Sequence, residues 1–197
     1  MSASTEGVQG IVTHFGLAEQ GKLHALSGEH DRALLYYRHA MRMAVGEGAP
    51  EAFFRHYLEC TIESLELMES FEDVLDYCRR ADDHYKGVVT TDEHQIAFIA
   101  RDRVAIAQRR GLVLAKLERR GEAIDWLAET RRRASLAKMD VPLIAVLDEW
   151  LRRGLHVSTE RIVAEQRRLC YFAVTPDSVD PSRAVSLPEA LLTPGAA

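Results

Sequence analysis

The stretch GLAEQGKLHALSGEHDRALLYYRHAMRMA, residues 16–44, decides the fold of this chain. Apolar residues recur in it at steps of three and four, which is the period of an α-helix that is buried along one face. Ser27-Gly28 interrupts this pattern, and glycine commonly ends a helix. The stretch therefore predicts two amphipathic helices joined by a short turn.

Small residues stand in this stretch where the two helices would cross closely. Gly21 would let the second helix approach, Ala33 and Ala40 would do the same from the other side, and the aromatic ring of Tyr37 would fill the space between helix pairs. This arrangement resembles the tetratricopeptide repeat family. The positions that carry the resemblance are Leu17, Gly21, Gly28, Ala33, Tyr37 and Ala40.

The same pattern returns twice along the chain in a weaker form. Its matching positions are Val74, Cys78, Ala81, Gly111, Ala123 and Leu127. Counted from Ala33 to Val74 to Ala123, the copies lie 41 and 49 residues apart, whereas the common repeat has roughly 34 residues. The spacing is similar to the longer repeats of kinesin light chains and of bacterial peptide-sensing regulators.

Helical periodicity continues between every pair of chain breakers, so the sequence predicts at least seven helices and no β-sheet. Thr90, with Glu93 three residues later, matches a capping box and predicts the start of a long helix. We expect a flexible N-terminus at residues 1–8 and one helical domain at 9–174. The helix pairs are expected at about 13–45, 51–86, 91–137 and 142–173.

The end of the chain, residues 175–197, contains four prolines among Ser, Asp and Gly. Such a composition is typical of a flexible tail that is dispensable for folding. Within it, Leu187–Leu192 is apolar enough to dock as a short helical turn, on this molecule or on another.

The resemblance implies an all-α fold in which antiparallel helix pairs stack as a short right-handed solenoid. It also implies a non-catalytic protein–protein interaction module, an adaptor or scaffold that binds a partner protein in the groove of the solenoid. A peptide-sensing regulator or a chaperone-like client binder is the alternative, and self-association stays open.

In this family the first helix of each pair lines the groove. Carried over position by position, the partner-binding residues are Phe15, Lys22, His56, Glu59, Glu63, Glu66, Arg101, Gln108, Arg109 and Lys116. Some family members clamp a terminal carboxylate with cations and amides, but Glu59 and Glu63 occupy such positions here. The sequence therefore excludes a carboxylate clamp.

Charge is distributed unevenly along the chain. Up to Gln95 there are 8 basic and 17 acidic residues, and after it 17 basic and 13 acidic ones. Glu59, Glu63 and Glu66 lie on one face of a helix, where like charges repel unless a basic partner segment lies across them. The alternative interpretation is a solvated helix face, with the partner bound to apolar surface elsewhere.

Other chemistries find little support in the sequence. The three cysteines are widely spaced and fit core or half-buried positions better than a disulfide framework. His84 and His94 flank an acidic loop, but they form no recognised metal motif, and no nucleotide-binding or nucleophile motif is present. We therefore expect no enzyme activity, no metal and no cofactor.

Two further classes of partner are disfavoured. Arginine clusters such as Arg131–Arg133 could contact nucleic acid, but the sequence pI of about 5.9 argues against it. No stretch approaches the ~20 apolar residues that span a bilayer, and the polar N-terminus lacks the regions of a secretory signal. We therefore expect no membrane insertion and a cytoplasmic location.

Overall fold

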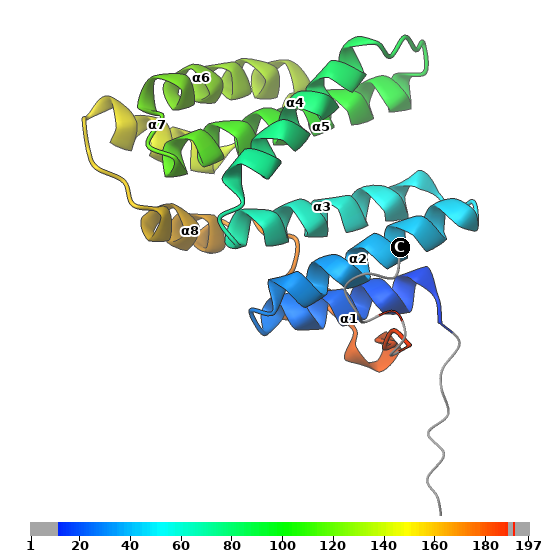
Figure 1. Ribbon diagram of the computed structural model, residues 1–197. Helices are drawn as coiled ribbons and strands as arrows, with labels where there is room; N and C mark the ends of the chain where they lie inside the picture. The colour runs from blue at the N-terminus through cyan, green and yellow to red at the C-terminus, as the bar shows by residue number, and fades with distance from the viewer. Residues whose placement is uncertain (1–11, 189–190, 192–197) are drawn as a thin grey trace, which may run out of the picture. The chain divides into compact units, whose positions relative to one another are not determined.

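A computed structural model describes residues 12–188 and residue 191 (Figure 1). The expected flexible N-terminus, 1–8, lies outside these residues. The described part contains eight α-helices and no strand, which confirms the predicted all-α class. The helices are α1 (His14–Leu26), α2 (His30–Gly46), α3 (Glu51–Leu67), α4 (Phe71–Lys86), α5 (Glu93–Lys116), α6 (Arg120–Ala137), α7 (Pro142–Arg152) and α8 (Thr159–Arg168).

Side-chain caps fix the start of several helices. Thr13 accepts a hydrogen bond from the N–H of Gly16 at the start of α1, and Ser158 accepts one from the N–H of Arg161 at the start of α8. The capping box predicted at Thr90 is wrong. Asp92 caps α5 instead, because its carboxylate accepts the N–H groups of His94 and Gln95, and a carboxylate also suits the positive end of the helix dipole.

The chain divides into two compact units. Unit 1 holds α1 to α3 and the described residues from Ala173 onward, and unit 2 holds Glu69–Phe172. This differs from the single domain expected at 9–174. The expected pair at 51–86 is split, because α3 packs against α2 and α1 whereas α4 packs against α5.

In unit 1, short turns join α1 to α2 and α2 to α3, so that neighbouring helices run antiparallel (Figure 1). Leu17, Ala33, Tyr37 and Ala40 are all buried, as the repeat pattern predicted. Gly21 lies against the ring of Tyr37: a Cβ built on Gly21 would come within 2.6 Å of the ring atom Cε1. Glycine is required at position 21 because the ring of Tyr37 leaves no room for a side chain.

Gly21→Ala should therefore destabilise the protein. Because the ring of Tyr37 is fully buried, we expect a loss of about 1 to 3 kcal/mol from overpacking. Gly46→Ala is the matched control, since Gly46 ends α2 and a Cβ there meets no atom within 4 Å. The measurement is the midpoint of thermal unfolding, and equal melting of both variants would contradict the close crossing.

Unit 2 has an apolar core built from α5, α6, α7 and α8, with the partly buried Leu75 of α4 packed against it. Val74, Cys78, Ala123 and Leu127 are fully buried, and a Cβ on Gly111 would lie 2.9 Å from a methyl group of Leu127. The weaker copies of the repeat pattern thus also bury their small and apolar residues, except Ala81, which is half-buried. Beside this core, Arg133 of α6 donates hydrogen bonds to Asp82 of α4 (2.8 Å) and to Glu129 (2.7 Å).

Glu129 should make the stability of unit 2 depend on pH. A hydrogen bond from Arg132 lowers the pKa of Glu129 from 4.5 to about 2; burial opposes this shift and Arg133 adds to it. A carboxylate with a lowered pKa stabilises the folded state above its ordinary pKa, and this contribution is lost as the pH falls through 4.5 toward 2. Glu129→Gln should thus melt below the unmodified chain at pH 7, and the two should converge near pH 2. A difference that is equal at both pH values would contradict this account.

None of the described helices combines the length and apolar character that crossing a membrane requires.

Candidate functional site

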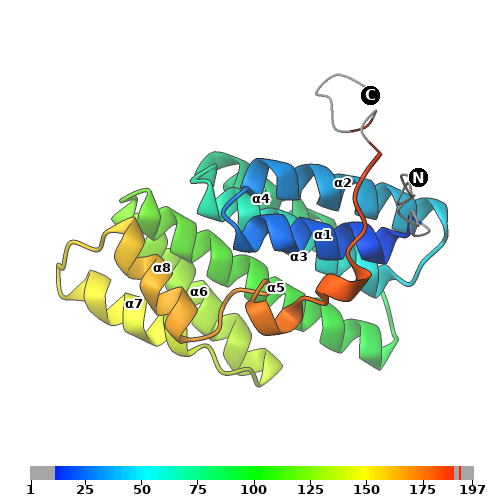
Figure 2. The ribbon, with the colours of Figure 1, turned by 90° about the horizontal axis from the view of Figure 1, so that it is seen from below.

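The residues from Ala173 to Pro188 form a segment that we call the C-terminal strap. It lies along α1 of unit 1, where Figure 2 shows it in orange to red. Val174 and Leu187 are only 8% and 4% exposed. The expectation of a flexible tail is therefore wrong for residues 175–188, because these residues bury apolar side chains and make hydrogen bonds to the helices of unit 1.

The strap contains two short 3₁₀ turns of the same design. Pro176–Ser178 follows Thr175, and Pro181–Arg183 follows Asp180. In each, a side chain before the proline accepts an N–H of the turn, and proline suits the first position because its φ is fixed and it lacks the N–H. The prolines thus pre-organise the strap and reduce the entropy lost on docking.

The first anchor of the strap is Glu63 of α3. Its carboxylate accepts the backbone N–H of Ala173 at 2.7 Å and that of Val174 at 3.3 Å. The side chain of Val174 packs into a buried cluster with Ala33, Tyr37 and Cys60. Glu63 is only 3% exposed, so these N–H groups replace water around a buried carboxylate.

The second anchor is a buried ion pair on α1. The Lys22 ammonium lies 2.9 Å from the Glu19 carboxylate and donates a further hydrogen bond to the carbonyl of Ser178 at 3.2 Å. Glu19 accepts the backbone N–H of Asp180 at 2.7 Å. Both side chains are almost fully buried. The pair therefore contacts the strap through one main-chain acceptor and one main-chain donor.

The third anchor lies where the strap crosses the start of α1. The N–H of Val185 donates to the carbonyl of Gly16 at 3.0 Å, and the N–H of Leu187 donates to the hydroxyl of Tyr36 on α2 at 3.2 Å. The side chain of Leu187 joins the buried cluster that contains Tyr36. The last part of the strap is thus held by both backbone and side chain.

Three of the residues predicted for the groove contact the strap. These are Lys22, Glu63 and Phe15, whose ring lies 5.3 Å from the guanidinium of Arg183. His56 is half-buried on α3; burial, and next the charge of Lys22, lower its pKa. Lys22 and Glu63 lie on the faces of α1 and α3 that hold Ala173–Asp180, and we call this surface the α1/α3 face.

The acidic stretch of α3 is not a solvated face. Glu63 and Glu66 are 3% and 1% exposed, and Glu59 is half-buried. The solvated alternative is therefore wrong for Glu63 and Glu66. For Glu63 the compensation comes from the N–H groups of the strap, because the partial positive charge of two N–H groups stabilises a buried carboxylate.

The remaining predicted residues belong to α5 of unit 2. Arg101 is exposed and Gln108 half-buried, whereas Arg109 and Lys116 are buried. Arg109 lies over the ring of Tyr171, at 5.4 Å, and Lys116 over the ring of Phe71, at 5.8 Å. That these four residues take part in partner binding stays a prediction.

Sequence reasoning missed Gly16, Glu19 and Tyr36, which all contact the strap. Glu19 could have been found, because it precedes Lys22 by three residues and therefore shares its helix face. Gly16 and Tyr36 gave no such signal. Their roles depend on where Val185 and Leu187 dock, and both of these residues lie more than 150 positions later in the chain.

Cys60 and His56 form a pair beside Val174 that has the composition of a catalytic dyad. The Sγ atom lies 3.8 Å from Nε2 of the imidazole. Burial, however, raises the pKa of the Cys60 thiol to about 12, and the thiolate is the nucleophilic form of cysteine. The thiol is thus protonated at neutral pH and fits the core position that the sequence predicted.

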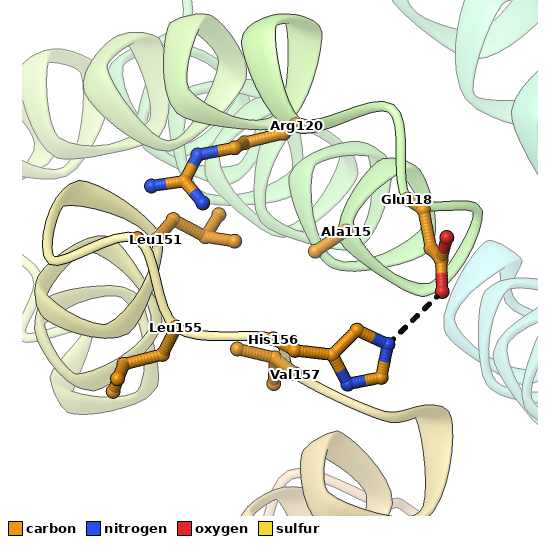
Figure 3. Close-up of a pocket in the computed structure, with 8 residues that line it drawn as sticks. Ala115, Glu118, Arg120, Leu151, Leu155, His156 and Val157 are labelled. Carbon is orange, nitrogen blue, oxygen red and sulfur yellow. Dashed lines mark hydrogen bonds and ion pairs between the residues drawn. The ribbon is translucent and has the colours of Figure 1, made fainter.

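Unit 2 has a hollow of about 240 Å³ between the α5–α6 turn and the segment after α7 (Figure 3). Apolar side chains such as Leu151 and Val157 line it, and His156 contacts Glu118 at 3.3 Å. Both of these polar side chains are about three-quarters exposed. The hollow is smaller than the roughly 300 to 1,000 Å³ of most ligand sites and brings together no buried acid and base.

Among the residues that the structure describes, no group of three or more His, Cys, Asp or Glu side chains could hold a metal ion. Comparison with known protein families, with curated proteins and with solved structures finds no match.

Proposed function

We propose that this chain is a non-catalytic protein–protein interaction module that binds an extended segment of a partner protein on the α1/α3 face. The observation that carries the proposal is that this face already holds an extended segment, the strap, through Glu63, Lys22 and Glu19. In this structure the strap occupies the site at which a partner segment would bind.

The contacts on the α1/α3 face suit a binding site better than a permanent core. Each of the three charged side chains contacts main-chain atoms of the strap, which every peptide carries. Main-chain hydrogen bonds give affinity for extended peptides in many recognition modes. In a permanent contact, apolar side chains would stabilise the fold more, because burying charges costs free energy that their pairing only partly offsets.

The repeat pattern supports the same proposal. Most of its small and apolar positions are buried in both units, although Gly28 is exposed and Ala81 half-buried. A tetratricopeptide-like solenoid of helix pairs would present α1 and α3 as groove-lining helices. We infer a cytoplasmic adaptor or scaffold with no cofactor. Fold alone does not fix function, so the contacts of the α1/α3 face carry the argument.

The chain connectivity favours a second candidate, a peptide-sensing regulator. The chain leaves unit 1 after Met68 and returns to it at Ala173. A peptide that displaced the strap would free the returning end from the helices of unit 1. Peptide binding would thereby change the state of the chain at Ala173, directly after unit 2 ends.

The proposal is tested with a full-length chain whose strap is released by Val174→Asp and Leu187→Asp, since a carboxylate is costly in either apolar cluster. A displayed library of unstructured peptides is selected against this chain, and binding of the enriched peptides is measured by fluorescence anisotropy. Peptides that use the α1/α3 face should lose about tenfold or more in affinity with Glu63→Gln, because a charged hydrogen bond contributes about 1.5 to 3 kcal/mol.

Glu51→Gln is the matched control, because Glu51 is an exposed residue of the same helix. It should bind the enriched peptides as the parent does. Circular dichroism checks that all variants keep their helices. Failure to enrich any peptide, or enrichment of peptides that bind equally to the Glu63→Gln variant, would overturn the proposed function.

A further inference from the structure

We propose that Gly16 forms a specificity notch for a segment of the form Arg-x-Val-x-Leu, and that a partner protein binds by supplying such a segment in place of residues 183–187. The inference rests on the proposed function and names the chemistry of its partner. Its basis is the way in which the strap crosses the start of α1.

The notch is made by the missing side chain of Gly16. A Cβ built there would lie 2.7 Å from Cγ2 of Val185 and 2.9 Å from the carbonyl oxygen of Arg183. Real Cβ atoms do not approach that closely, so any other residue would push the strap away from α1. Gly16 lies within the first turn of α1 and has no positive φ. Contact with the strap, and not backbone conformation, therefore accounts for a glycine here.

Three side chains near the end of the strap contact the helices of unit 1. Arg183 lies over the ring of Phe15, Val185 lies on Gly16, and Leu187 is buried in the cluster with Tyr36. Ser186 is exposed, whereas Ala184 is half-buried like Val185, and the backbone at Ala184 is extended. An extended chain presents alternate residues to one side, so this surface selects most strongly at positions 185 and 187 and tolerates variation at 186. Arg183, the last residue of the second 3₁₀ turn, adds an exposed contact before the extended part.

The two parts of the strap are recognised in different ways. The charged side chains of the α1/α3 face bond to main-chain atoms of the strap. The start of α1 and the Leu187 cluster contact side chains of the strap in addition to two of its backbone N–H groups. A site that binds one extended ligand needs both, since the backbone contributes affinity and the side-chain pockets contribute specificity. The matching partner is an unstructured segment of another protein with arginine, a small β-branched residue and leucine at alternate positions.

The probe is a fluorescent synthetic peptide with the sequence of residues 173–188. It should bind the full-length strap-released variant (Val174→Asp, Leu187→Asp). It should bind the unmodified chain about 100-fold more weakly or worse, because the tethered strap competes at an effective concentration near millimolar. Equal binding to both chains would mean that the peptide binds elsewhere and would overturn the inference.

The notch is tested by adding Gly16→Ala to the strap-released variant. We expect a loss of about tenfold or more in affinity for the probe, since overpacking costs about 1 to 3 kcal/mol. Gly46→Ala is the matched control and should leave binding unchanged, because a Cβ at Gly46 meets no neighbour. Circular dichroism and thermal melting confirm that both variants fold.

A double-mutant cycle separates a direct contact from a general loss of stability. The probe is also made with Val185→Gly. This change should lower the affinity of the probe for the strap-released variant with Gly16, but it should lower the affinity little further for the same variant with Gly16→Ala. The reason is that the effects of substitutions at two residues in contact do not add. Additive losses would overturn the notch. So would a library in which peptides bind through Glu63 but lack the Arg-x-Val-x-Leu pattern, although the proposed function would then stand.

Exchange of straps between two copies of this chain would satisfy the same chemistry. Light scattering of the unmodified chain shows whether the bound segment comes from a second copy of this chain or from a different protein. A monomer at micromolar concentration supports a separate partner, and a dimer that the Gly16→Ala variant fails to form would overturn that assignment.

Discussion

Truncation of the chain after Phe172 is expected to destabilise unit 1 strongly. Val174 and Leu187 are buried in unit 1, and each such side chain contributes about 1.5 to 3 kcal/mol when it is fully buried. We therefore expect a loss of about 3 to 6 kcal/mol for the two side chains together. This would lower the thermal midpoint of unit 1 by more than about 10 °C, since 1 kcal/mol corresponds to 4 to 8 °C in a domain of this size.

The control for this truncation is Leu191→Ala, because Leu191 is 36% exposed. It should melt within about 0.5 kcal/mol of the unmodified chain, as is usual for surface substitutions. Both variants are followed by circular dichroism and by differential scanning calorimetry. An unchanged thermal midpoint after truncation would restore the sequence-based expectation of a dispensable tail.

Arg133→Leu should be the most destabilising single substitution that we propose in unit 2. The guanidinium of Arg133 bonds to Asp82 and Glu129 and to the carbonyl of Arg103 at 3.2 Å, and it is largely buried. Burial raises the pKa of Asp82, but Arg133 and then Arg103 outweigh this effect and keep it low. Loss of one partner of a buried pair costs about 3 to 5 kcal/mol. Because Arg103 remains beside Asp82, we expect the lower end of this range.

Arg132→Leu provides the comparison for Arg133→Leu. Arg132 also bonds to Glu129, but its side chain is 62% exposed, and exposed ion pairs contribute about 0 to 1 kcal/mol. Chemical denaturation of the two variants should therefore differ by about 2 kcal/mol or more. Equal stability would mean that the cluster of Asp82, Arg133 and Glu129 does not stabilise the packing of α4 on α6.

The helices could be predicted from the sequence because their signals are local. The end of α2 at Gly46 and the start of α7 at Pro142 follow from breakers and caps within a few residues. Gly21 opposite Tyr37 followed from one repeat pattern in a single stretch of chain. Even the error at Thr90 is small, because Asp92 caps the same helix two residues later.

The strap could not be predicted, because its contacts join residues that are far apart in the chain. Glu63 bonds to residues 110 and 111 positions later, and Glu19 to a residue 161 positions later. No periodicity reports such a pairing. Composition was also misleading, because Pro176 and Pro181 indicated flexibility whereas they begin ordered turns. The prediction of Lys22 and Glu63 as binding residues came from the repeat resemblance, and the structure places both against an extended segment.

Hydrogen exchange of the strap amides is the most direct test of the claim that the α1/α3 face is a peptide site occupied by the strap. The full-length unmodified chain is exchanged alone and with a saturating excess of a peptide selected on the strap-released variant. The amides of Ala173, Val174 and Asp180 should then exchange faster, because their hydrogen bonds to Glu63 and Glu19 pass to the peptide, while the amides of α1 and α3 keep their protection. Unchanged protection of the strap in the peptide-bound chain would contradict the account, because the strap would then be a permanent part of unit 1.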